Sequence, residues 1–311
     1  MALALAILTY FAYAFIIFMD ARKAIKYAKM PVHLRWDLYP MVRNGDGSHH
    51  TAFRHGTQSD KNRGKRFIKN FLFILKDNFY LGEYFHKNRG YWCVLFPWHV
   101  GFLLILTFNG LCFLAAFATF AGLFLPPEPS NLVGRSLYYA ILVTGFGSFI
   151  IGSLGSIGML TIRLASRELR AYASPINYFN YVFLLAVFST GFYAGYSFDP
   201  TFSEYRGFWK GLVTLNPIDV HFAWAIHIIL FALVKLYLPF TRSMHYVTRF
   251  FAFLWVYWDD RPNAKGSAIE KAVQGSMDHP VSWSAPHIPS GKRWADLDSQ
   301  SAIPSSSEVR R

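Results

Sequence analysis

The sequence predicts an all-α integral membrane protein built as a bundle of five transmembrane helices. Of its 311 residues, 53% are hydrophobic and 19% are aromatic, whereas a soluble domain has about 45–50% apolar residues. Charged residues are concentrated between long apolar stretches, each close to the roughly 20 residues that a membrane helix needs. The five stretches cover residues 1–18, 94–124, 136–162, 176–197 and 218–240.

The first stretch predicts an uncleaved membrane helix rather than a signal peptide. No basic segment precedes its apolar part, and its first positive charges, Arg22 and Lys23, follow that part. The three middle stretches contain no Asp, Glu, Lys or Arg. The last stretch contains a single lysine, Lys235. Each of the five is therefore apolar enough to cross a bilayer.

The basic residues predict the orientation in the membrane. Segments 19–92 and 163–175 and the tail after 240 together hold 27 of the 31 Lys and Arg residues. The positive-inside rule places these segments in the cytoplasm, with the N-terminus outside and the C-terminus inside. We expect a multi-pass protein of the inner (cytoplasmic) membrane. Because membrane lipid and topology explain the net charge of +13, we expect no nucleic-acid partner.

Two histidines point to a metal cofactor, because ionisable residues inside a membrane usually have a function. His99 and His245 both fall at the cytoplasmic side, since the second helix runs outward and the fifth runs inward. Two neutral imidazoles that face each other across a bundle form a bis-histidine haem site. The alternative is a pair of polar residues hydrogen-bonded to the backbone or at the interface. No Cys, Asp or Glu converges there to favour zinc.

A third histidine, His227, lies 18 residues before His245. Eighteen residues are about five turns of an α-helix. The spacing therefore predicts that His227 and His245 share one face of the fifth helix at opposite depths, unless Pro239 bends that helix.

The outer level lacks an obvious second ligand, because the residue ten positions after His99 is Asn109, which can hydrogen-bond but ligates iron poorly. Either this level has no haem, or His221 supplies the ligand, or His227 lines a quinone pocket. Lys235 either extends along its helix to the interface or pairs with a haem propionate. Arg135 is either a quinone-pocket residue or an ordinary interface anchor.

These residues resemble a known family. The segment 238–245 (LPFTRSMH) is similar to the closing motif of the gamma subunit of respiratory nitrate reductase, and 98–102 (WHVGF) is similar to its first haem-binding motif. The resemblance covers roughly residues 90–250. It implies two b haems between the second and fifth helices, with quinone as redox partner. His99 and His245 match the ligands of the inner haem and His227 matches one outer ligand, while Asn109 stands where the other outer ligand is expected.

A second resemblance concerns the approach to the second helix. The basic amphipathic stretch 65–79, followed by Arg89-Gly90, resembles the membrane subunits of heterodisulfide-reductase-type complexes. These include the cytochrome b subunits of the Dsr and Tmc complexes of sulfate reducers. This branch implies a cytoplasmic iron–sulfur partner and often a periplasmic multihaem cytochrome c.

The sequence thus predicts four parts. Residues 1–18 form the first transmembrane helix, and 19–92 form a basic cytoplasmic loop with an amphipathic interfacial helix. Residues 93–250 form a four-helix haem-binding membrane core, and 251–311 form an extended or flexible cytoplasmic tail that docks a partner. The predicted function is electron transfer between menaquinone and an iron–sulfur protein in anaerobic respiration. One haem b is expected, and two if the outer level finds another ligand; the rival is a haem-free membrane anchor.

Overall fold

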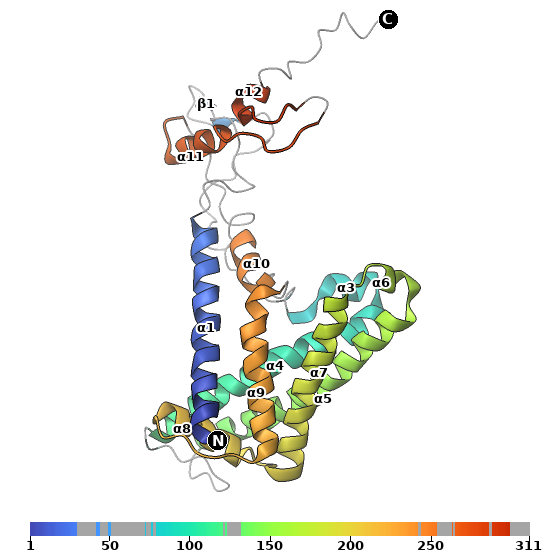
Figure 1. The fold of residues 1–311 in the computed structure, drawn as a ribbon, viewed down its shortest axis with the longest axis vertical. Coiled ribbons are helices and arrows are strands. Elements are labelled where there is room, and N and C mark those ends of the chain that lie inside the picture. The colour runs from blue at the N-terminus through green and yellow to red at the C-terminus, as the bar shows by residue number, and fades with distance from the viewer. Residues whose placement is uncertain are drawn as a thin grey trace, which may run out of the picture. The chain divides into compact units, whose positions relative to one another are not determined.

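The computed structural model describes residues 1–29, 42–43, 49–50, 72, 76, 79–120, 122, 132–241, 244–253, 263, 265–285 and 288–298. The chain divides into two compact units. The first contains Met1–Ala21 and Phe73–Met244, and the second contains Arg22–Leu72 and His245–Arg311. Figure 1 shows the long helices that build the first unit.

Five helices are long and apolar enough to cross a membrane, which confirms the predicted number of spans. Four of them extend beyond their apolar stretch; α1, for example, continues ten residues past the predicted end because Arg22, Lys23 and Lys26 are good helix formers. The direction in which the helices cross the membrane stays a prediction. The spans are α1 (Ala2–Ala28), α4 (Arg89–Phe120), α5 (Leu132–Ala165), α7 (Pro175–Phe198) and α9 (Phe222–Tyr237) with the 3-10 turn η2 (Leu238–Phe240).

Short elements connect the spans or belong to the second unit. In the first unit these are α3 (Gly82–Lys87), α6 (Arg167–Ala171) and α8 (Ser203–Val213). The second unit contains the antiparallel pair β1 (Val42–Arg43) and β2 (His49–His50), with α10 (His245–Phe253), α11 (Ala268–Met277) and α12 (Trp294–Asp298).

Segments 19–92 and 251–311 differ from the predicted loop and tail where they are described. The tail is not simply extended, because α11 and α12 form within it, and the Ser267 hydroxyl caps α11 by accepting the Glu270 N–H at 3.1 Å. The predicted amphipathic helix in 65–79 lies almost wholly outside the described residues. The docking role of the tail stays a prediction.

Glycines let α4 and α5 approach very closely. A Cβ atom on Gly101 would lie 2.3 Å from the Gly152 Cα, and one on Gly155 would lie 2.2 Å from the Trp98 backbone nitrogen. Helices in lipid associate through such small residues because close backbone approach maximises dispersion contacts. The α4–α5 pair is therefore the tightest part of the bundle, and α5 packs in turn on α7, and α7 on α9.

The fifth span is interrupted before His245. The α-helix of α9 ends at Tyr237, the 3-10 turn surrounds Pro239, and Thr241 is extended at φ −101° and ψ 170°. His245 then begins a separate helix, α10. His227 and His245 therefore lie on separate helices, which is the exception expected at Pro239, because proline cannot donate a helical hydrogen bond.

Candidate functional site

His227 is fully buried and has a free ring nitrogen. Its Nδ1 donates to the Val187 carbonyl at 3.0 Å, while its Nε2 has no partner among the described residues. The rings of Phe149 and Trp224 lie 5.3 and 5.6 Å from it, between centroids. A histidine fixed through Nδ1 with Nε2 left over has the chemistry of a metal ligand.

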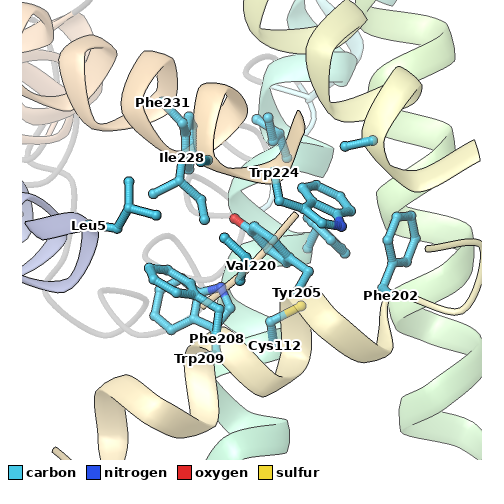
Figure 2. Close-up of a cluster of buried hydrophobic side chains, with 14 of the residues drawn as sticks. Leu5, Cys112, Phe202, Tyr205, Phe208, Trp209, Val220, Trp224, Ile228 and Phe231 are labelled. Atoms are coloured by element: carbon cyan, nitrogen blue, oxygen red, sulfur yellow. The ribbon is translucent and has the colours of Figure 1, made fainter. Parts of the chain in front are cut away.

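Asn109, which stands where the other outer ligand is expected, makes two hydrogen bonds within the protein. The Tyr205 hydroxyl donates to its Oδ1 at 2.8 Å, and its amide nitrogen donates to the Ile105 carbonyl at 2.8 Å. Tyr205 also stacks on Phe108 at 5.2 Å and packs on Trp224 at 4.5 Å. Figure 2 shows Tyr205 in the middle of this cluster, with the indole of Trp224 beside it. The side-chain oxygen and nitrogen of Asn109 are thus both used within the protein.

Beside Tyr205 the described residues leave only a small space. The space shared by Asn109, Tyr205, Ile228 and Phe231 has a volume of about 10 Å³, which is enough for one water molecule. His227 does not line this space. No haem site is visible at this level among the described residues, although the free Nε2 of His227 would suit an iron ligand.

The helix α8 fills the outer level, and one carboxylate holds α8 in place. Asp199 is buried and accepts the backbone N–H groups of Ser203, Glu204 and Tyr205 at 2.7–3.1 Å. It also accepts the Trp224 indole N–H at 3.2 Å, which ties the start of α8 to α9. Because a carboxylate at a helix N-terminus satisfies unpaired N–H groups, it stabilises the turn into α8.

The five predicted spans leave residues 198–217 without an assigned element, so α8 was not predicted. The signal was present, because the buried residues of α8 recur at the spacing of one helical face. These residues are Tyr205, Phe208, Trp209 and Leu212.

His221 serves as a helix cap. It is the N-cap of α9, where its Nδ1 accepts the Ala223 N–H at 3.3 Å, and its ring stacks on Phe198 at 3.9 Å. These two contacts account for a polar residue at position 221, so a role as an iron ligand is not needed to explain it.

Lys235 lines a large cavity between α1, α4, α8 and α9. The cavity has a volume of about 680 Å³, and Asn109 and Tyr13 also line it. The Lys235 side chain is only 7% exposed, and its Nζ lies 3.2 Å from the Phe231 ring centroid and 4.5 Å from that of Tyr13. The expectation that Lys235 extends to the interface is wrong, because these rings hold its ammonium group inside the bundle.

The other three predicted residues lie on three different helices. His99 is half-buried on α4, three residues before Phe102, which lines the cavity. His245 is exposed at the start of α10 and belongs to the second unit, so its pairing with His99 stays a prediction. Arg135 is exposed in the first turn of α5 and is not among the described residues that line the cavity.

The fold defines a multi-pass integral membrane protein with a buried histidine and an interior cavity. The family model of the nitrate reductase gamma subunit matches residues 85–259, more than half of the chain. The chain therefore belongs to the nitrate reductase gamma subunit family, and it is a membrane electron-transfer subunit of a multisubunit respiratory complex. Gamma subunits are haem b cytochromes that use quinols. No curated protein and no solved structure shows a significant match to the chain.

Proposed function

We propose that this protein carries one haem b and transfers electrons between the menaquinone pool and a cytoplasmic iron–sulfur partner. Family membership carries the proposal, because the matching segment 85–259 includes both His99 and His245. The positive-inside rule supports an N-terminus outside and a C-terminus in the cytoplasm. This orientation puts the basic loop and the tail on the side of the iron–sulfur partner.

In this proposal His99 and His245 hold the inner haem. When bound, the haem would supply one-electron transfer, and the two histidines would hold it. The chain supplies the histidines, the low-dielectric surroundings and the orientation. The hydrogen bond from Tyr205 to Asn109, which stands where the other outer ligand is expected, supports one haem rather than two.

The partner is best sought among heterodisulfide-reductase-like proteins of anaerobic respiration, including those of sulfate reduction. The long basic segment 19–92 and the 61-residue tail 251–311 support this branch, because both add cytoplasmic surface next to the membrane core. A multihaem cytochrome c would contact the opposite side.

The test is haem quantification in the purified full chain and in a histidine variant. We expect about one haem b per chain by pyridine haemochrome, since one bis-histidine site is available. His245→Ala should lower this value to near zero while the protein still inserts and stays monodisperse. The matched control is His279→Ala, which removes an exposed tail histidine.

Two results would overturn the proposal. A wild-type protein without haem, expressed in haem-replete cells, would leave the membrane-anchor function. Unchanged haem in the His245→Ala variant would refute the ligand assignment.

A further inference from the structure

The cavity beside α1 has the size and walls of a ligand site. Its volume of about 680 Å³ lies within the roughly 300–1,000 Å³ of small-molecule pockets. Large aromatic side chains from four helices form much of its wall, which suits a flat ring. They include Tyr13, Phe102, Phe113, Phe117, Trp209 and Phe231.

The polar groups of the wall point to an oxygen acceptor in the ligand. The hydroxyls of Thr9 and Tyr10 are already used, since they donate to the carbonyls of Leu5 and Leu212. The Lys235 ammonium contacts two aromatic faces, and within the described part of the chain no carboxylate lies at ion-pair distance. A buried ammonium group needs a hydrogen-bond acceptor, because its desolvation is otherwise uncompensated.

The walls argue against a haem as the occupant. The described residues that line the cavity include no His, Met or Cys, so they offer iron none of its common ligands. The chemistry fits an organic molecule without a metal.

The depth of the cavity argues against a phospholipid headgroup. Tyr13, Asn109 and Lys235 lie within the spans α1, α4 and α9, each more than one turn from the span's end. A phosphate at this depth would have to leave water, at a high free-energy cost. A neutral carbonyl on a flat ring would not, and it would accept a hydrogen bond from the lysine.

We propose that this cavity binds the ring of an isoprenoid quinone, with the Lys235 ammonium donating a hydrogen bond to a ring carbonyl. Asn109 lines the same wall beside the ring. The identity of the quinone rests on the proposed function. The location of the site cannot be deduced from the family match alone, because α1 supplies one wall of the cavity and lies outside the matching segment 85–259.

Two variants test the site from different directions in the full chain in nanodiscs. Lys235→Gln removes the charged donor. Gly110→Phe fills the cavity, and a Cβ atom on Gly110 meets nothing within 4 Å, so the helix accepts the larger residue. Their controls are Lys210→Gln, an exposed lysine of α8, and Leu114→Phe, a 56% exposed residue of α4 that does not line the cavity.

The probe is a water-soluble menaquinone analogue, with its Kd measured by titration. Lys235→Gln should raise the Kd about tenfold or more, as expected for a lost hydrogen bond to a charged donor. Gly110→Phe should abolish binding, and both controls should bind like the wild type. Haem content should stay unchanged in all four variants.

Other outcomes overturn the inference and separate it from the proposed function. Wild-type-like binding in both cavity variants places the quinone elsewhere. Haem loss in Lys235→Gln with intact quinone binding assigns the lysine to a haem propionate. Binding of anionic phospholipid to the cavity, without binding of the quinone analogue, makes the cavity a lipid site. Quinone binding that depends on Lys235 in a wild type without haem supports the site and sinks the proposed electron-transfer function.

Discussion

The two sides of α4 are built in opposite ways. Toward α5, glycines bring the two backbones so close that a single added methyl group would collide with main-chain atoms. Toward α1 and α9, the same helix faces an open cavity, and Gly110 has nothing near it. One helix thus combines a rigid contact with a space for a ligand, and the rigid contact fixes the wall of that space.

The contacts of α1 explain why the cavity stays open. This helix meets the bundle through side chains: Tyr13 packs on Trp209 at 5.7 Å, and the Tyr10 hydroxyl donates to the Leu212 carbonyl at 2.5 Å. Both partners belong to α8, so α1 packs on the same short helix that places Tyr205 beside Asn109. A change to the α4–α5 contact and a change to α8 should therefore have separable effects.

The largest effect is expected at the α4–α5 contact. Gly155→Leu would place a side chain against the Trp98 backbone, and we expect it to destabilise the fold by about 3 kcal/mol or more. The yield of monodisperse protein and its thermal unfolding in detergent measure this. Gly110→Leu on the cavity side is the matched control and should be tolerated. Equal losses in both would show that the two sides do not differ.

A smaller effect is expected when α8 loses its capping carboxylate. Asp199→Ala leaves the indole N–H of Trp224 and three backbone N–H groups without their acceptor, which should cost about 2–3 kcal/mol. Thermal unfolding followed by tryptophan fluorescence reports the loss. Asp219→Ala, which alters an exposed carboxylate, should change stability by less than about 0.5 kcal/mol. A stable Asp199→Ala variant would mean that packing alone positions α8.

The smallest effect is expected for the single hydrogen bond between Tyr205 and Asn109. Tyr205→Phe leaves the buried Asn109 Oδ1 without its donor, at about 1–2 kcal/mol. Adding Asn109→Leu should recover part of that loss, since the unpaired oxygen is then gone. The unfolding free energies of the two single variants and the double variant give the coupling. A coupling energy near zero would mean that the hydrogen bond between Tyr205 and Asn109 does not stabilise the fold.

The sequence predicted the spans better than it predicted the site. Apolar length alone located all five helices, because a bilayer imposes it on every span. The sequence also indicated that the Asn109 side chain can hydrogen-bond, since an amide hydrogen-bonds more readily than it ligates iron. Two tertiary facts were not readable: that α8 turns inward, and that the Tyr13 ring lies over the Lys235 ammonium group. Each depends on contacts between residues far apart in the chain.

The way α1 is attached has a consequence for how the protein is made. α1 is synthesised before α8, because Leu212, the hydrogen-bond partner of Tyr10, follows it by 202 residues. The newly made helix must therefore be stable in the bilayer before its partners are present. Leu3, Ile7 and Phe11 on its exposed surface suit it to contact with lipid. It docks only when α8 and α9 have emerged, so closing the cavity wall is among the last steps of assembly.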